Sequence, residues 1–251
     1  FGLNIFVERL PSAVFGIFSV FLVFLIVNKL FKSFSLSLLS AFLFAVNPWE
    51  IHLARQGLLE NEALFFVLLG VCLFFYSDRR KYLLIFSALS FGLSLYSYDA
   101  PKIFLPPFLP LLFYFNKERL LKIKKFALFF VLIFMIFYGS ILHLTFFQGD
   151  IADYNRSSIF GSIPESVDSE RYLTKAPLRL SSIFHNKLTV AIKRFETSYV
   201  SIFSLNWFFI NGSHNLQHSV ANHGQFLLFE LPFFFIGMYL AFKKSARLGI
   251  F

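Results

Sequence analysis

The sequence has few charged residues and one cysteine. Only 15% of its 251 residues are charged, against about a quarter in soluble domains. Cys72, being alone, cannot form a disulfide within the chain. The chain is instead 57% hydrophobic, has Phe at 40 positions and has a mean hydropathy of +0.68. This composition excludes an ordinary soluble domain and predicts an integral membrane protein.

The apolar residues come in runs near the length that crosses a bilayer. Five runs approach about 20 residues, and two shorter runs cross if they tilt or end at polar cavities. The longer runs are 11–30, 59–77, 82–97, 126–147 and 226–242, and the shorter ones are 35–47 and 102–115. Backbone N–H and C=O groups find no hydrogen-bond partners in lipid, so a span is either a helix or part of a closed β-barrel. The runs lack the alternation of apolar and polar residues that a barrel shows. We therefore predict an all-α bundle of about seven transmembrane helices.

The basic residues predict the orientation. With seven spans, four basic clusters fall on one side, at Lys29 with Lys32, at 79–81, at 117–125 and at 243–247. The positive-inside rule makes that side cytoplasmic, in a multi-pass protein of the inner (plasma) membrane surrounded by membrane lipids. The net charge of +9 thus indicates topology. No nucleic-acid motif accompanies it, so we expect no nucleic-acid partner.

The opposite, external face holds 1–10, 48–58, 97–101 and a long polar segment, 148–225. We expect one membrane domain, 1–251, in which 148–225 forms an external lobe. Because structureless loops of this length are uncommon, the lobe should contain short helices. The stretch 181–203 mixes apolar and basic residues as an interfacial helix does.

Residues 47–66, NPWEIHLARQGLLENEALFF, place His52, Arg55, Glu60 and Glu62 just before a strongly apolar run. Taken singly, each has an ordinary explanation as a helix cap or a headgroup contact. Together they suggest a site, because charge at membrane depth is costly and is often functional. Glu60 and Glu62 point to nearly opposite sides of a helix. We select Glu60, which lies nearer Arg55 in the sequence.

Three more charged residues belong to the same predicted face: Arg9 just before a span, and Asp99 and Lys102 at a helix junction. Asp99 also suits a helix cap, and Lys102 suits snorkelling to the interface. If the helices form a bundle, these residues share an external cavity with Arg55 and Glu60. Cations in such a cavity suit a phosphate, and a carboxylate suits a general base.

The segment SHNLQHSVANHGQ, 213–225, contributes His214, His218 and His223. It has no HExxH motif and no cysteine partner, so substrate contact by His218 and His223 is favoured over a metal site. The ordinary alternative for each is a surface histidine whose ring nitrogens are hydrogen-bonded and which has no functional role. No cofactor is certain, and a divalent metal stays an alternative.

Three successive segments resemble bacterial glycosyltransferases of the GT-C superfamily, notably the protein O-mannosyltransferases and lipid A aminoarabinose transferases. They are RLPSAVFGIFSVFLVFLIVNKLF, LLSAFLFAVNPWEIHLARQGLLENEALFF and GLSLYSYDAPKIFLPPFLPLLF. HSVANHGQFLLFELPFFFIGMYL resembles the end of the external lobe and the next span. The resemblance implies an enzyme that takes a sugar from a polyprenyl-phosphate carrier and passes it, on the external face, to a protein, lipid or glycan acceptor.

The resemblance also implies roles. Arg9 matches an arginine near the carrier phosphate, Arg55 an arginine of the second external loop, and Glu60 the acidic position after it. We therefore predict Glu60 as catalytic. The predicted substrate-binding residues are Arg9, Arg55, His52, Asp99, Lys102, His218 and His223. Family members carry a catalytic acid in an earlier loop, after a first span. Neither precedes Phe1, so we expect an N-terminally truncated chain without its principal catalytic base.

Two other classes of function are alternatives to this enzyme. A transporter or flippase of a lipid-linked or anionic substrate would use the same cations in a cavity, but transporters often show internal repeats, and none is visible. A non-catalytic scaffold would need no cluster of ionisable groups on one face. The glycosyltransferase hypothesis is preferred.

Overall fold

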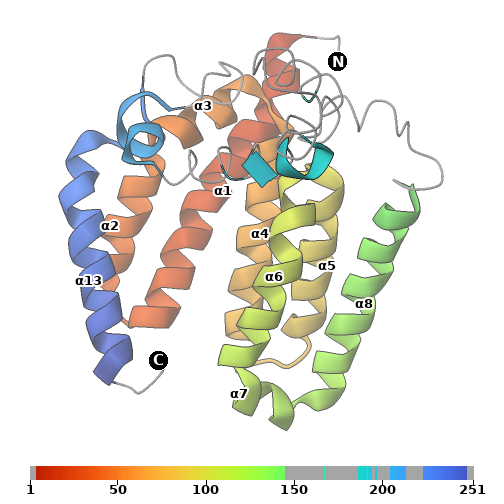
Figure 1. Cartoon of the computed structure of the whole chain (residues 1–251). Helices are drawn as coiled ribbons and strands as arrows, with labels where there is room; N and C mark the ends of the chain where they lie inside the picture. The colour runs from red at the N-terminus through yellow and green to blue at the C-terminus, as the bar shows by residue number, and fades with distance from the viewer. Residues whose placement is uncertain are drawn as a thin grey trace. The chain divides into compact units, whose positions relative to one another are not determined.

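The computed structural model describes residues 4–144, 167, 186–190, 192–193, 196, 204–212 and 223–247 (Figure 1). By its internal contacts the chain divides into two compact units, Phe1–Ile141 with Phe209–Phe251, and Leu142–Phe208. Within the described residues the regular structure is helical and includes no strand. The predicted all-α class is therefore confirmed. The expected lobe and the expected interfacial helix lie mostly outside the described residues.

The helices follow the predicted apolar runs. They are α1 (Ile5–Phe31), α2 (Phe34–Ala45), α3 (Pro48–Gln56), α4 (Leu59–Tyr76), α5 (Leu83–Ser97), α6 (Ala100–Phe115), α7 (Lys117–Lys122), α8 (Lys124–His143), η2 (Asn206–Ile210), η3 (Leu228–Glu230) and α13 (Leu231–Arg247). Each of the seven predicted runs falls on a helix, namely on α1, α2, α4, α5, α6, α8 or α13 with η3.

Helix length and composition also bear on the number of membrane spans. By length and composition, α1, α4 and α8 are suited to cross a membrane, and α2 with α3, bent by 56°, can add a fourth span. At about 1.5 Å per residue, α1 is about 40 Å long, which exceeds the roughly 30 Å hydrocarbon core. The apolar helices α5 and α6 are shorter. The count of seven stays a prediction.

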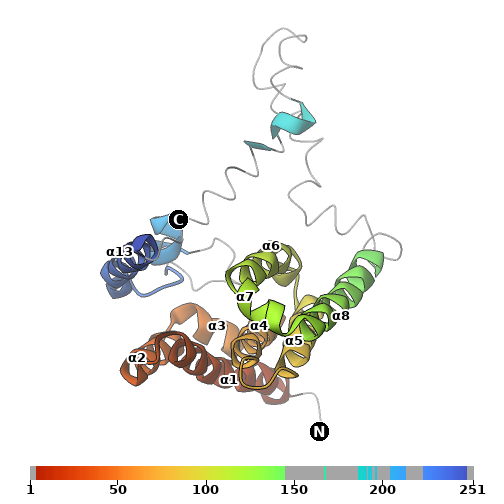
Figure 2. The same cartoon turned by 90° about the horizontal axis from the view of Figure 1, so that it is seen from below.

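Helix α1 packs against α2, α3 and α4, and α4 packs along α5 (Figure 2). Small residues allow the α4–α5 contact. A Cβ added at Gly70 would lie 2.7 Å from Cε1 of Phe91, a fully buried ring. The Ser87 hydroxyl donates a 2.7 Å hydrogen bond to the Gly70 carbonyl. Close approach over glycine and interhelical hydrogen bonds from serine are typical of helix packing in membranes.

Helix α6 contains three prolines, Pro106, Pro107 and Pro110. Pro106 has no N–H to donate to the carbonyl of Lys102, one turn earlier. The Tyr138 hydroxyl of α8 donates to this carbonyl at 3.4 Å. A neighbouring helix thus supplies a partner for a backbone group that proline leaves free, as membrane helices require.

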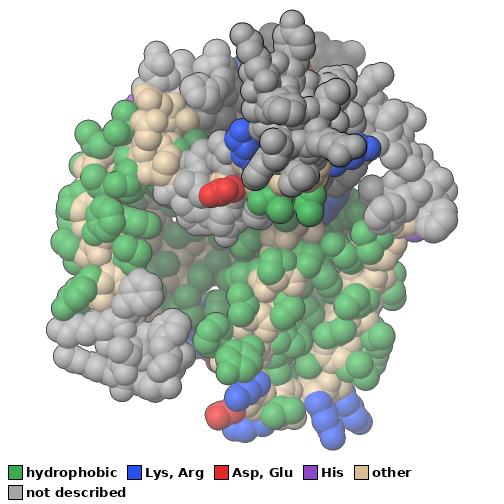
Figure 3. Space-filling model, in the orientation of Figure 1, with side chains coloured by type: hydrophobic (Ala, Val, Ile, Leu, Met, Phe, Trp, Pro, Cys, Tyr) green, Lys and Arg blue, Asp and Glu red, His purple; other side chains and the backbone are tan. Residues whose placement is uncertain are grey.

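Three of the predicted basic clusters meet at one end of the bundle. Lys29 near the end of α1 forms a 2.5 Å ion pair with Asp78, in the turn after α4. Arg119 of α7 donates to the Phe74 carbonyl at 3.2 Å. Figure 3 shows hydrophobic side chains along the helices and Lys and Arg side chains at the end where α7 lies. Along the helices, many apolar side chains are strongly exposed, including Ile17 at 70% and Ile136 at 69%. Such exposure suits contact with lipid.

Candidate functional site

Helix α3 begins and ends with residues that fix its position against α1. The Asn47 side chain caps α3, accepting hydrogen bonds from the backbone N–H groups of Trp49 and Glu50, and Pro48 takes the first helical position. The helix ends at Gly57, whose φ of 73° is left-handed. A Cβ at Gly57 would lie 3.4 Å from Cα of Arg9, so the turn lies directly against α1. This contact brings the start of α1 and the end of α3 together.

A groove between these helices has a volume of about 460 Å³ and contains two of the predicted substrate-binding residues. We call it the α1–α3 groove. Its charged residues are Arg9, Glu50 and Arg55, and its apolar residues on α1 are Phe6, Leu10, Ala13, Ile17 and Val20, with Ile51 on α3. Arg9 and Arg55 are exposed, and neither forms an ion pair within the part of the chain that the structure describes. The groove therefore offers two cations that can bind an anion.

The apolar part of the α1–α3 groove follows one face of α1. Its residues recur at intervals of three and four positions, from Phe6 to Val20, which is the spacing of a single helix face. Fourteen residues of helix span about 21 Å. The groove therefore has two arginines near one end, a long apolar face along α1, and Glu50 beside Gly16 partway along that face. An anionic head with a hydrocarbon tail suits the arginines and the apolar face.

Glu60 lies in a second cluster, at the start of α4. The Tyr98 hydroxyl, at the end of α5, donates a hydrogen bond to the Glu60 carboxylate. Burial first, then the charge and hydrogen bond of Glu60, and then the charge of Asp99 raise the pKa of the Tyr98 phenol above its ordinary value. Tyr98 therefore stays a hydrogen-bond donor at neutral pH. Asp99 and Lys102 form a 2.5 Å ion pair in which Asp99 is 81% exposed.

The remaining predicted residues are placed as follows. His52 lies on α3, with its Nε2 2.9 Å from Nε2 of Gln56, and is not among the residues that line the α1–α3 groove. Nδ1 of His223 lies 3.0 Å from the Gly224 carbonyl oxygen, and His218 lies outside the described residues. Among the described residues, no group of three or more His, Cys, Asp or Glu side chains is arranged to hold a metal ion.

The structure also shows an acidic residue that the sequence reasoning missed. Glu50 lines the α1–α3 groove but is only 4% exposed. A signal for this was present in the sequence, because Glu50 precedes Leu53 by three residues and so lies on the same helix face. Leu53 is an apolar residue and is 1% exposed. The inward direction of Glu50 was thus open to prediction from its spacing.

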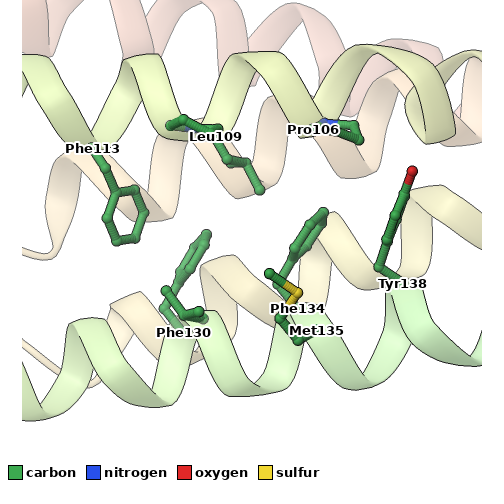
Figure 4. A pocket seen from close by; sticks show the side chains of 9 residues that line it. Pro106, Leu109, Phe113, Phe130, Phe134, Met135 and Tyr138 are labelled. Atoms are coloured by element: carbon green, nitrogen blue, oxygen red, sulfur yellow. The ribbon is translucent and has the colours of Figure 1, made fainter.

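A further cavity, of about 320 Å³, lies between α6 and α8 (Figure 4). The side chains that enter it from α6 include Pro106, Leu109 and Phe113, and those from α8 include Phe130 and Phe134. None of its lining residues is charged. It therefore lacks the cations that distinguish the α1–α3 groove.

These features describe a membrane-embedded helical protein with basic clusters at one end of the bundle and, at the other end, the α1–α3 groove with Arg9 and Arg55 and the nearby cluster of Glu60 with Tyr98. Residues 1–143, more than half of the chain, match the family described as dolichyl-phosphate-mannose-protein mannosyltransferase, and the chain belongs to that family. It is a membrane glycosyltransferase of the GT-C type, as the resemblance in the sequence implied. No curated protein and no solved structure shows a significant match.

Membership of this family implies a lipid-linked sugar donor and an acceptor. The matched residues include the whole α1–α3 groove together with Glu60 and Tyr98. The family thus indicates the kind of activity. The α1–α3 groove and the cluster of Glu60 with Tyr98 contain the candidate residues.

Proposed function

We propose that the protein transfers a sugar from a polyprenyl-phosphate carrier to an acceptor hydroxyl on the external face of the inner (plasma) membrane. The observation that carries this proposal is the α1–α3 groove, in which Arg9 and Arg55 stand at the head of a long apolar wall. A guanidinium binds phosphate oxygens through a planar fork of N–H donors. The apolar wall suits the isoprenoid chain that follows the phosphate in such a carrier.

We infer the external position of the reaction from the distribution of basic residues between the two ends of the bundle. The basic clusters at Lys29, 79–81 and 117–125 belong to one end of the bundle, and the α1–α3 groove belongs to the other. The positive-inside rule assigns the basic end to the cytoplasm. The groove and Glu60 then face the outside of the membrane.

Among the residues of this chain, we propose Glu60 as a general base, distinct from the principal catalytic acid that the family resemblance implies. The acceptor hydroxyl oxygen attacks the anomeric carbon of the sugar, and the bond between that carbon and the phosphate oxygen breaks. The carrier phosphate leaves with the electron pair, and the hydroxyl proton passes to the Glu60 carboxylate. The hydrogen bond from Tyr98 orients this carboxylate, while Arg9 and Arg55 stabilise the charge on the leaving phosphate. His52, Asp99, Lys102, His218 and His223 stay proposed contacts of donor or acceptor.

The experiment is a transfer assay with the purified intact gene product in proteoliposomes and labelled polyprenyl-phosphate mannose. Glu60→Gln keeps the size of the side chain and removes its charge, and we expect transfer to fall by about 10²- to 10⁴-fold, the usual contribution of a general base. Glu62→Gln is the matched control, because helix geometry directs Glu62 away from Glu60. We expect it to keep near-normal transfer.

The same preparation separates an enzyme from a transporter or flippase. An enzyme gives labelled acceptor together with free polyprenyl phosphate. Movement of the intact labelled lipid across the bilayer, with no labelled acceptor in any preparation, would contradict the proposal.

A further inference from the structure

The short helix α7 connects α6 to α8 at the basic end of the bundle (Figure 1). Two hollows lie against it, with volumes of about 750 Å³ and about 220 Å³. We call them the basic hollows. The cations that line them are Lys117, Arg119 and Lys122 in the larger one, and Lys81, Lys122, Lys124 and Lys125 in the smaller one. Lys122 therefore lines both.

The lysines of the basic hollows are available to an anion. All of them are exposed, and none forms an ion pair within the described part of the chain. Arg119 is engaged instead, because it donates to the Phe74 carbonyl at 3.2 Å and lies 4.7 Å from the centre of the Phe74 ring. Basic residues at a cytoplasmic end are an ordinary topology signal. A ligand is indicated by what lies next to them.

The apolar cavity of about 320 Å³ between α6 and α8 begins about one helical turn from the basic hollows (Figure 4). On α8, Phe126 lines the smaller hollow and Phe130 lines the cavity. Residues four apart lie on one helix face. On the other side, Phe113 of α6 lines the cavity, and Lys117, four residues later, lines the larger hollow. Cations and an apolar wall thus follow each other between the same two helices.

The length of the cavity indicates what fits it. Its lining extends from Phe113 to Pro106 on α6 and from Phe130 to Tyr138 on α8, which is about 10–12 Å at about 1.5 Å per residue. Half of the roughly 30 Å hydrocarbon core is about 15 Å. The cavity therefore fits within the leaflet at the basic end of the bundle. A hydrocarbon chain in it would belong to a lipid whose headgroup lies at the level of the lysines.

We propose that the α6–α8 cavity and the basic hollows together bind one anionic phospholipid, with an acyl chain between α6 and α8 and its phosphate among the lysines. The cytoplasmic leaflet is rich in anionic lipids, and basic pockets between membrane helices suit their headgroups. The lipid carrier of the transfer reaction is assigned to the α1–α3 groove, at the other end of the bundle. The phospholipid site is therefore independent of the proposed function.

The test measures binding of labelled phosphatidylglycerol and phosphatidylcholine, with the same acyl chains, to the purified intact gene product in detergent. We expect saturable binding that is tighter for phosphatidylglycerol, because its headgroup has a net negative charge. Lys122→Gln should weaken that binding by about fivefold, the effect of the roughly 1 kcal/mol that each cation near an anionic lipid surface contributes. Lys32→Gln is the matched control, since Lys32 is exposed at the same end but lines neither hollow. It should leave the affinity nearly unchanged.

A second pair of variants tests the acyl chain and keeps every charge. Val131→Phe adds bulk to the wall of the cavity. It should weaken phosphatidylglycerol binding by about four- to fifteenfold, the effect of displacing one or two CH₂ groups at about 0.8 kcal/mol each. Leu128→Phe, at an exposed position of α8 outside the cavity lining, should have little effect. If Val131→Phe does not fold, the exposed Lys122→Gln still tests the site.

Equal affinity for the two phospholipids, or equal losses in Lys122→Gln and Lys32→Gln, would overturn the site and leave the lysines as a topology signal. Unchanged binding in a folded Val131→Phe would overturn the place of the acyl chain. Two other occupants are tested in the same assay. Polyprenyl phosphate that binds more tightly than phosphatidylglycerol and depends equally on Lys122 would assign the site to the carrier. Displacement of the phospholipid by an equal concentration of glycerol 3-phosphate would assign the lysines to a soluble phosphate, and either result would overturn the proposal.

Discussion

Replacing Arg9 by alanine removes one of the two guanidinia that line the α1–α3 groove. A hydrogen bond to a charged group contributes about 1.5–3 kcal/mol. Because Arg9 and Arg55 are both exposed, the solvent weakens their attraction for an anion, and the lower end of this range applies. At about 1.4 kcal/mol for each factor of ten, we expect Arg9→Ala to weaken binding of polyprenyl phosphate by about tenfold.

Arg55→Ala should have an effect of similar size, and the double variant tests whether the two arginines act on one phosphate. Groups that share a ligand show coupling of about 0.5–3 kcal/mol in a double-mutant cycle. Arg9→Lys should recover only part of the affinity, because lysine keeps the charge but lacks the planar fork.

The assay is equilibrium binding of polyprenyl phosphate to the purified protein, followed by transfer rates with the sugar-carrying donor. Arg79→Ala is the matched control, since Arg79 lies at the other end of α4, with its guanidinium 6.0 Å from the ring of Tyr76. Unchanged affinity in both Arg9→Ala and Arg55→Ala would refute the phosphate assignment. The two arginines would then be headgroup contacts at the membrane surface.

Three other predictions concern the fold and its orientation. Gly70→Ala should destabilise the protein by about 1–3 kcal/mol, because the new methyl group meets a buried phenylalanine ring. At Gly139 an added Cβ would meet no atom of another segment within 4 Å, so Gly139→Ala should leave thermal unfolding nearly unchanged. Equal effects of the two substitutions would contradict the packing argument. Tyr138→Phe should cost about 0.5–1.5 kcal/mol by removing the hydrogen bond to a carbonyl of α6, measured in the same unfolding assay. A membrane-impermeant thiol reagent applied from outside should label a cysteine at Ser162 and spare one at Arg80, and the reverse pattern would overturn the orientation.

The helices could be predicted from the sequence because lipid imposes a simple requirement, long apolar runs with satisfied backbones. The runs 59–77 and 82–97 became α4 and α5 with nearly the predicted bounds. The number of spans did not follow as directly. A run such as 35–47 ends at a bend into α3, and whether such a broken pair counts as one span depends on its angle.

Part of the arrangement expected from the sequence is present in the structure. Arg9 and Arg55 were expected to share a cavity, and both line the α1–α3 groove. The partner of Glu60 was not expected. Proximity in the sequence pointed to Arg55, whereas Glu60 receives a hydrogen bond from Tyr98 on another helix. Such pairings depend on how each helix rotates about its axis, which is set by packing across the whole bundle.

Glu50 was missed for a related reason. An acidic residue in the first turn of a helix has an ordinary role near the helix dipole, so Glu50 did not stand out in the sequence. Its spacing from Leu53 indicated the inward direction, and the contact that buries it, with Gly16 of α1, joins segments far apart in the sequence.

We propose that the sugar comes from a lipid-phosphate carrier, and a choice between two donors tests this proposal. The purified intact gene product is given an acceptor and either labelled polyprenyl-phosphate mannose or the same sugar on a nucleotide. We expect transfer from the lipid-linked donor only, with one polyprenyl phosphate released for each sugar transferred. Transfer directly from the nucleotide sugar, with no need for the lipid carrier, would contradict it.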